Sequence, residues 1–231
     1  SNSSPSLTVV VVNWNGRELL DDCLESLKAP DLDLRVLMVD NGSHDDSVAY
    51  CRKHYPHVEI LESADNLRWA GGNNLALRQL LNEGLPDGVL LLNNDTIVCE
   101  GALNRMMQTL MVEGQWAVTP RICYADHPDI LWYDGGEVGR WTGWVSHRGI
   151  RKPVTGASLQ QTESGYGTGC ALLLSRKTIE TVGLLDEDYY LYAEDTDYSL
   201  RLQASGGRVA HDPTAVVLHK VSRTTGADSP R

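Results

Sequence analysis

A chain of 231 residues is long enough to bury one substantial core, as one α/β domain or as two small ones. With 42% hydrophobic and 22% charged residues, its composition is that of a soluble globular protein. The formal net charge of -11 argues against nucleic acid or an anionic membrane surface as the main partner, because both repel a negative protein at long range. An anionic small molecule is still compatible, through a metal ion or a local basic patch.

The cysteines indicate a reducing compartment. The five are scattered, odd in number and without a CxxC pair or zinc-finger histidine spacing, so we expect reduced, mostly packed thiols in a cytoplasmic protein. No signal peptide or membrane span is visible. The sequence opens without a Met, which is compatible with a longer natural protein that carries membrane-associated segments.

The first part of the chain predicts a βαβ unit. The β-branched run 7–12 is typical of a strand, and it ends in a Gly-containing turn at 13–16. Apolar residues at helical spacing then predict a helix over 17–27, and a second strand over 34–39 ends at Asp40. The two strands should be parallel, since a helix connects them.

A Gly-rich helix entry comes next. After a helix over about 45–54 and a weaker strand over 58–61, the polar segment 65–74 opens a helix over about 70–82. Its paired glycines allow close approach of the backbone to a ligand, and a helix N-terminus favours negative charge. Helix packing alone also produces such an entry, so both interpretations stay open.

The Val/Leu run 88–92 reads as a strand buried on both faces, and it stops at Asn93, Asn94 and Asp95. In an open α/β sheet, ligands bind beyond the carboxyl ends of the strands. Asn13, Asp40 and this triplet each follow a predicted parallel strand, so we expect them at one edge of the sheet. Considered alone, the triplet is explained equally well by a polar turn.

The second half is less regular. A helix over 101–113 and a strand over 116–119 are followed by residues 124–161, which lack helical periodicity and predict irregular strands and loops. Aromatic residues there, including Trp132, fit either a sugar-acceptor surface or a small satellite core. Regular structure returns with a strand over 168–175.

An acidic, tyrosine-rich stretch precedes the last helix. A short helix over 176–182 comes first, and a helix that continues to 204 has Glu194 and Asp195 in its first turn, where the helix dipole favours anions. Helix capping explains these acids as well.

The chain then ends in two short strands, over 209–211 and 215–218, and one compact basic run from His219 to Arg223. No repeat, low-complexity segment or linker divides the chain, which predicts a single domain over 1–231.

Nucleotide-binding motifs of two other classes are missing. The first turn lacks GxGxxG and no GxxxxGK[ST] occurs, which argues against a dinucleotide dehydrogenase and a P-loop NTPase. Six short motifs instead resemble family-2 glycosyltransferases of the GT-A fold, the group that includes bacterial rhamnosyltransferase-like enzymes. The matching segments are 10–16, 39–43, 66–74, 92–95, 167–171 and 192–197. They follow the family's order over nearly the whole chain.

The resemblance implies an α/β fold with a single open, mostly parallel (mixed) sheet flanked by helices. It places a nucleotide-sugar-binding half at about 7–98 and an acceptor-side half at about 99–225. It also implies a metal-dependent, inverting transfer from a UDP-, dTDP- or GDP-linked sugar to a hydroxyl of a glycan or lipid-linked glycan. The resemblance thus implies a cytoplasmic reaction, which would take place at the inner face of the membrane if the acceptor is lipid-linked.

Site residues also follow from the resemblance. It places Asp40 at the nucleotide base, Asp95 with His219 at Mg²⁺ or Mn²⁺, and Asp195 at the general base. Further donor-side residues are Asn13, Asn66, Arg68, Gly72, Asn73, Asn93, Asn94, Lys220 and Arg223. Acceptor-side residues are Gly169, Trp132 and Glu194.

Two departures from the family pattern concern the donor site. Asn93 replaces the first acid of the family's DxD motif, which leaves few anionic ligands for a metal. Arg68 and Trp69 replace the Gly-Phe pair common in relatives, at the loop that meets the donor.

Elementary chemistry agrees with this assignment. A leaving diphosphate needs its developing charge neutralised, which a divalent cation does, and Lys220 and Arg223 would assist. The acceptor hydroxyl needs a carboxylate base, for which Asp195 is the choice.

Two alternatives stay open. A sugar nucleotidyltransferase would need a Gly-rich loop with Arg or Lys after the first strand, which residues 13–16 do not offer. A non-catalytic nucleotide- or carbohydrate-binding module with the same fold is supported by Asn93.

Overall fold

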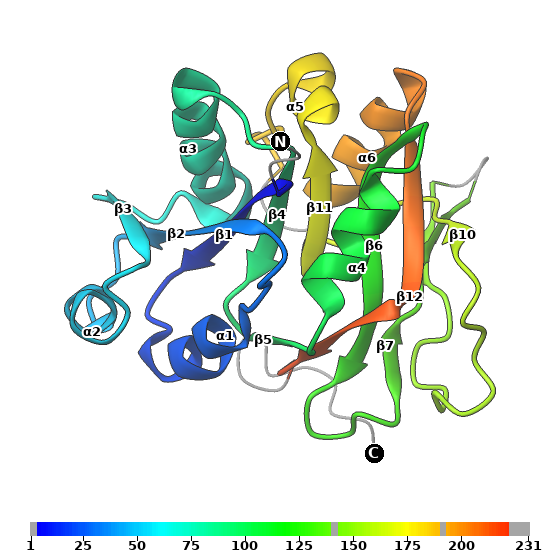
Figure 1. Cartoon of the computed structure of the whole chain (residues 1–231), viewed down its shortest axis with the longest axis horizontal. Helices are drawn as coiled ribbons and strands as arrows, with labels where there is room; N and C mark the ends of the chain where they lie inside the picture. The colour runs from blue at the N-terminus through cyan, green and yellow to red at the C-terminus, as the bar shows by residue number, and fades with distance from the viewer. Residues whose placement is uncertain (1–3, 140–142, 190–192, 222–231) are drawn as a thin grey trace.

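The computed structural model describes residues 4–139, 143–189 and 193–221. These residues form one curled, mixed sheet with helices on both faces (Figure 1). The order of strands along the sheet is β10-β12-β6-β11-β4-β1-β2-β3, with β5 paired to β12 and β7 paired to β6. The predicted open α/β sheet is therefore confirmed.

The strands of the N-terminal half are parallel to one another. They are β1 (Ser6–Asn13), β2 (Asp33–Asn41), β3 (Glu59–Ser63) and β4 (Gly88–Asn93). The remaining part of the sheet is mixed, since β11 runs antiparallel to both β4 and β6 while β12 is parallel to β6. Its strands are β5 (Thr96–Val98), β6 (Gln115–Tyr124), β7 (Leu131–Tyr133), β10 (Thr162–Glu163), β11 (Ala171–Ser175) and β12 (Arg208–His219).

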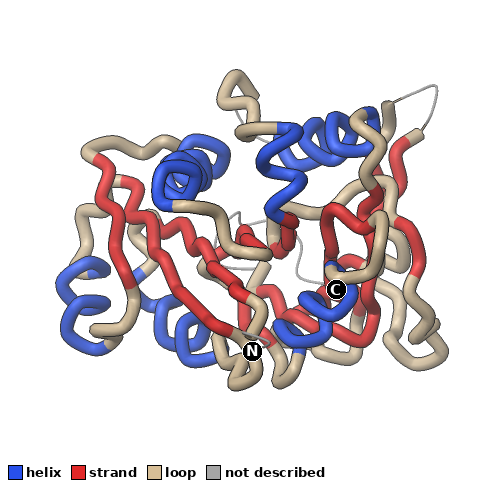
Figure 2. Tube along the Cα trace, turned by 45° about the horizontal axis from the view of Figure 1, so that its top comes forward, coloured by secondary structure: helices blue, strands red, loops and turns tan. Residues whose placement is uncertain are grey.

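Helices cover both faces of the sheet, and each face has its own core (Figure 2). A short 3₁₀ turn (Arg17–Leu19) leads into α1 (Leu20–Ser26), which shares one face with α2 (Ser47–His54) and α4 (Ala102–Leu110). The other face carries α3 (Arg68–Glu83), α5 (Arg176–Val182) and α6 (Glu194–Ala204). Side chains alternate along β1, so that Val9 and Val11 enter the first core while Val10 enters the second.

Two strands are longer than predicted, because each continues through a proline. Strand β6 continues through Pro120 to Tyr124, and β12 is one strand with an irregular pairing register between Asp212 and Val216. Pro120 lies opposite Asp212. Because proline has no N–H to donate, the bulge falls where the ladder cannot be continued regularly.

Other elements have shifted boundaries. Helix α2 begins at Ser47 and α3 at Arg68, two residues from each predicted start. Strand β11 begins only at Ala171, since residues 168–171 form a turn in which the Ala171 N–H donates to the Thr168 carbonyl over 3.1 Å.

The irregular segment after β6 includes a small separate sheet. It consists of β8 (Gly136–Val138) and β9 (Val145–His147), which pair in antiparallel fashion. All five cysteines are free and four are buried, as predicted for packed thiols.

Candidate active site

The polar residues that follow the parallel strands meet at one edge, as predicted. Asn13 and Asp40 are register partners on β1 and β2, and the Asn13 amide donates to Asp40 Oδ1 over 3.1 Å. Asn94, which follows β4, donates to Asn13 Oδ1 over 3.0 Å. A Cβ atom on Gly16 would lie 2.3 Å from the Asn94 amide nitrogen, so this close approach requires glycine.

Asp40 is held mainly by protein donors. Its side chain is only 3% exposed, and Ser43 donates to it twice, from N to Oδ2 over 2.9 Å and from Oγ to Oδ1 over 2.6 Å. Together with Asn13, these donors use three of the roughly four acceptor positions of a carboxylate. The position that is left lies on Oδ2, which is enough for one N–H of a nucleotide base.

The loop before α3 is exposed and locally braced. Asn66 and Arg68 are exposed, and the Arg68 N–H donates to Asn66 Oδ1 over 2.8 Å. Arg68 has a φ of 62°, an uncommon value for a residue with a side chain. Asn41, at the end of β2, donates to its carbonyl over 2.9 Å. The loop is therefore fixed against the sheet edge with two predicted donor-side residues at its surface.

Gly72 and Asn73 lie beneath this loop. A Cβ on Gly72 would come within 2.9 Å of both Asn41 and Val12, so glycine allows α3 to pack on the strand ends. Asn73 is 1% exposed and donates to the Trp69 carbonyl over 2.9 Å. These two predicted donor-side residues support the loop from the inside.

Asp95 and His219 are brought together by strand pairing. Strand β5 places Thr96 opposite His219 on β12, so Asp95 comes next to the imidazole. His219 Nε2 and Asp95 Oδ2 are 3.2 Å apart, and both residues are at least nine-tenths buried. The Lys220 N–H also donates to the Asp95 carbonyl over 2.9 Å. The pairing predicted for a metal site is therefore present as a side-chain contact.

The pKa of His219 reflects this contact. Burial by itself lowers the pKa of the imidazole, whereas the hydrogen bond and the charge of the Asp95 carboxylate raise it. Trp132 packs edge-on against the ring, with centroids 4.5 Å apart. Because a carboxylate can only accept, His219 Nε2 carries the hydrogen that faces Asp95, and a cation bound between them must displace it.

The fit to a divalent cation rests on these two side chains. In the part of the chain that the structure describes, no group of three or more His, Cys, Asp or Glu residues is arranged for metal binding. Asp95 Oδ2 and His219 Nε2 converge closely enough to share one ion. Such a pair fits a cation that takes its other ligands from substrate oxygens and water.

Asn93, just before Asp95 in sequence, contacts the first turn of α3. Its Oδ1 accepts a hydrogen bond from the indole of Trp69 over 3.2 Å. The two departures from the family pattern thus contact each other.

Asp195 lies at the start of α6 in a setting of backbone donors. Its Oδ2 accepts the Gly169 N–H over 2.7 Å, and its Oδ1 accepts the Thr196 N–H over the same distance. Burial raises the pKa of this carboxyl, and these hydrogen bonds only partly offset the effect. A carboxylate with a raised pKa is a better proton acceptor than an exposed one.

Sequence patterns did not identify His147 as a residue of the site. It lies on β9, and its ring packs against that of Trp132 on β7. Its Nδ1 is 3.1 Å from the Trp132 carbonyl, which can only accept, so Nδ1 carries the proton and Nε2 is the bare nitrogen. Burial lowers the pKa of His147, although the nearby Asp195 charge opposes this. Tyr133 and Tyr166 pack around the same ring. The only sequence signal was a histidine within an aromatic segment.

The remaining predicted residues are placed as follows. Glu194 is 6% exposed, and burial raises its pKa. Lys220 forms an ion pair with Asp22 of α1 through its ammonium group. Arg223 lies outside the described residues.

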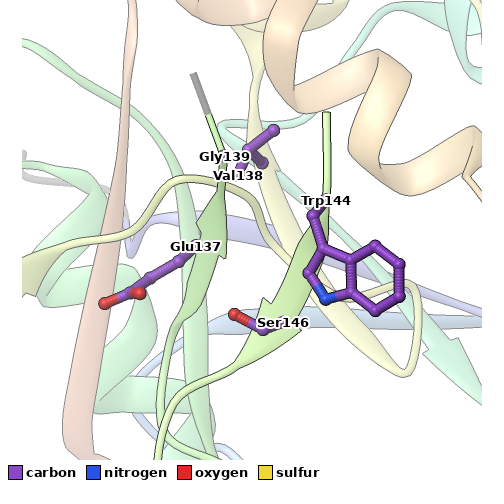
Figure 3. A pocket seen from close by; sticks show the side chains of 5 residues that line it. All are labelled: Glu137, Val138, Gly139, Trp144 and Ser146. Carbon is purple, nitrogen blue, oxygen red and sulfur yellow. The ribbon is translucent and has the colours of Figure 1, made fainter. Parts of the chain in front are cut away.

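A shallow surface pocket of about 450 Å³ lies next to the β8-β9 pair (Figure 3). Glu137, Val138, Gly139, Trp144 and Ser146 line it. None of them is a predicted site residue. The candidate site is therefore the open sheet edge itself, not this pocket.

The family model for glycosyl transferase family 2 matches residues 8–183, and the chain belongs to this family. It is a rhamnosyltransferase-like member with the GT-A fold.

A relative from Mycobacterium tuberculosis, N-acetylglucosaminyl-diphospho-decaprenol L-rhamnosyltransferase, is 28% identical over 96% of this chain and 78% of its own length. Among solved structures, GalNAc-T7 with UDP, GalNAc and Mn²⁺ has a TM-score of 0.75 at 13% identity, covering 95% of this chain and 44% of that one. A Pyrobaculum calidifontis mannosyltransferase with GDP-Man and Mn²⁺ has a TM-score of 0.68 at 16% identity, covering 97% and 59%. Among the described residues, no helix has the length and apolar character to cross a membrane.

Proposed function

We propose that this glycosyltransferase moves a sugar from a UDP-, dTDP- or GDP-linked donor to a hydroxyl of a glycan or lipid-linked glycan, with inversion at the anomeric carbon. The observation that carries the proposal is that two carboxylates near the strand ends have different surroundings, Asp95 after β4 and Asp195 hydrogen-bonded to Gly169 just before β11. Asp95 is paired with an imidazole, whereas Asp195 is held by backbone N–H groups and has a raised pKa. Asp95 is suited to a cation that binds the donor diphosphate, and Asp195 is suited to accept a proton from the acceptor hydroxyl.

On the donor side, Asp40 accepts an N–H of the nucleotide base at its remaining acceptor position. Asn13 and Asn94 hold this carboxylate and the neighbouring turn in place. Asn66 and Arg68 border the donor from the exposed loop before α3. The N-terminal half, about residues 7–98, thus supplies most of the donor contacts.

Asp95 and His219 would hold the divalent cation. Mg²⁺ prefers oxygen ligands, so an imidazole in the set favours Mn²⁺. When bound, the cation neutralises the negative charge that develops on the departing diphosphate. Mn²⁺ is present with the two solved structures compared above, which supports this assignment.

On the acceptor side, Asp195 takes the proton of the attacking hydroxyl. The hydroxyl oxygen bonds to the anomeric carbon as the bond from that carbon to the diphosphate breaks, so a single displacement inverts the centre. Trp132, Gly169 and Glu194 border this side, within the half at about residues 99–225. The name of the mycobacterial relative supports a diphospho-lipid-linked sugar as acceptor and L-rhamnose as the sugar transferred. Such an acceptor places the reaction at the cytoplasmic face of a membrane.

The proposal is tested by measuring binding and transfer with UDP-, dTDP- and GDP-sugars, in Mn²⁺ and in EDTA. Because the protein offers two metal ligands, we expect metal and donor to raise each other's affinity by the same factor. Asp95→Asn should abolish the difference between Mn²⁺ and EDTA. Equal donor affinity in both conditions for the unmodified protein would refute the metal role.

The stereochemistry and the reaction itself need separate readouts. NMR of the product should show an anomeric configuration opposite to that of the donor. Donor binding without transfer or donor hydrolysis would favour a non-catalytic binding module instead.

A further inference from the structure

Trp69 occupies a central place between two parts of the candidate site. Its indole N–H donates to Asn93 Oδ1, at the end of β4, over 3.2 Å. One side of the ring lies against Gly169, where a Cβ atom would come within 2.7 Å of Trp69 Cζ2. Gly169 therefore provides a flat support that keeps the indole in its plane.

The indole decides which way the Asn93 amide faces. An indole nitrogen can only donate, so the amide oxygen must face Trp69 and the amide nitrogen must face away from it. The Asn93 Nδ2 makes no hydrogen bond with any residue in the described ranges, and it is not among the buried polar atoms. Its two N–H groups are therefore presented at the sheet edge beside Asp95.

A phenylalanine at position 69 would leave the amide free to turn by 180°. The two orientations differ chemically, since one offers a carbonyl oxygen to a cation and the other offers two N–H donors to an anion. Near a diphosphate, an N–H donor forms a charge-assisted hydrogen bond, which is stronger than a neutral one. The tryptophan selects this second orientation.

We propose that Trp69 is a positioning residue that fixes the Asn93 amide with its N–H groups toward the donor diphosphate, so that Asn93 binds phosphate oxygen and leaves the cation to Asp95 and His219. This inference rests on the proposed function. It also explains why Trp69 and Asn93 occur together in this chain, because each residue completes the hydrogen bond of the other.

The first experiment measures the hydrogen bond without any substrate. In a ¹⁵N-labelled protein, the indole resonance assigned by its loss in Trp69→Phe should shift in Asn93→Ala. The indole of Trp116 is the matched control, because it also packs on a glycine, Gly207, and on the same core as Trp69, but it does not donate to Asn93. An unshifted Trp69 resonance would overturn the proposal, whether or not the protein proves to be a glycosyltransferase.

The second experiment is a double-mutant cycle on nucleotide affinity, with UDP, dTDP and GDP each titrated in Mn²⁺ by calorimetry. Trp69→Phe should weaken diphosphate binding about five-fold, the net contribution of one hydrogen bond. In the Asn93→Ala background, the same substitution should change affinity less than about two-fold. Trp116→Phe should leave affinity unchanged.

Three outcomes of the cycle would count against the proposal. These are an unchanged affinity in Trp69→Phe, an equal loss with and without Asn93, and an equal loss in Trp116→Phe. If none of the three nucleotides binds the unmodified protein, the proposed function fails, and the phosphate contact of Asn93 fails with it. The indole resonance still decides whether Trp69 fixes the amide.

Discussion

Two regions of the candidate site are built in opposite ways: the donor edge, formed by Asn13, Asp40 and Asn94, and the acidic corner, formed by Asp95, Asp195 and His219. At the donor edge, Asn13, Asp40 and Asn94 follow neighbouring parallel strands and satisfy one another by hydrogen bonds. At the acidic corner, Asp195 and His219 are titratable groups in buried surroundings, and the pKa values of both are raised. In the first region the polar groups are satisfied by protein partners, whereas in the second the pKa values of titratable groups are displaced from their ordinary values.

This difference suggests that binding and chemistry are separable in this enzyme. Hydrogen-bonded side chains orient a ligand without favouring its reaction, while a displaced pKa is useful mainly when a proton must move. Substitution of Asp40 should therefore change donor affinity, and substitution of Asp195 should change turnover.

The largest effect should come from Asp195→Asn. The amide keeps the shape of the carboxylate but cannot take the acceptor proton, so transfer should fall by at least about a hundredfold, within the usual range for a general base. Donor affinity measured by calorimetry should stay the same. Asp197→Asn, on the same helix and paired with Arg201, is the matched control and should retain transfer. Near-normal transfer in Asp195→Asn would remove the assignment of Asp195 as the base.

Asp40→Ala should do the reverse. Loss of a charged acceptor from the base-binding position should weaken donor binding by about 1.5–3 kcal/mol, or roughly ten- to a hundredfold, with kcat nearly unchanged. Circular dichroism must show that the variant is folded, because Asp40 also holds Asn13 and Ser43. Unchanged donor affinity in a folded variant would make Asp40 a turn residue only.

The pH dependence of transfer should separate the regions as well. Asp195 acts as a base only when ionised, and burial raises its pKa, so kcat should fall about tenfold per pH unit below a midpoint that is higher than the pKa of an exposed aspartate. The linkage has the corresponding sign, since a raised carboxyl pKa in the folded state makes ionisation of Asp195 cost stability at neutral pH. A midpoint no higher than the pKa of an exposed aspartate would contradict the role of burial.

A smaller effect should follow from Asn93→Asp. This substitution makes the two regions more alike, because it adds a carboxylate next to the donor edge. A second carboxylate beside Asp95 should raise Mn²⁺ affinity in the absence of donor by about fivefold, corresponding to ~1 kcal/mol. Electron paramagnetic resonance of free Mn²⁺ measures this change. Asn94→Asp is the control, since that side chain faces Asn13 instead, and an equal gain there would reflect charge alone.

Sequence patterns predicted that Asn13, Asp40 and Asn94 lie together, because their convergence depends on local signals. Strongly apolar strands end in polar residues, and parallel strands must bring those ends together. Asn13, Asp40 and Asn94 therefore followed from the order of elements alone.

The acidic corner depends on long-range pairing that no local pattern contains. Strand β5 has three residues, too few for a periodic signal, yet it places Asp95 next to His219, 124 positions away. His147 lies in a segment without periodicity. Lys220 belongs to the basic run, but its pairing with Asp22 of α1 could not be inferred from sequence spacing.

Strand β12 has a consequence for the way this protein is made. It is the last strand of the described chain, yet it lies inside the sheet, between β10 and β6, and also pairs with β5 (Figure 1). A chain emerging from the ribosome can pair β1 with β2 early, because these contacts are close in sequence. Asp95 cannot meet His219 until nearly all of the described residues have been synthesised. Until β12 has been made, the edges of β5 and β6 are unpaired and can pair with other chains. The period between the synthesis of β6 and that of β12 is therefore the one in which aggregation is most favoured.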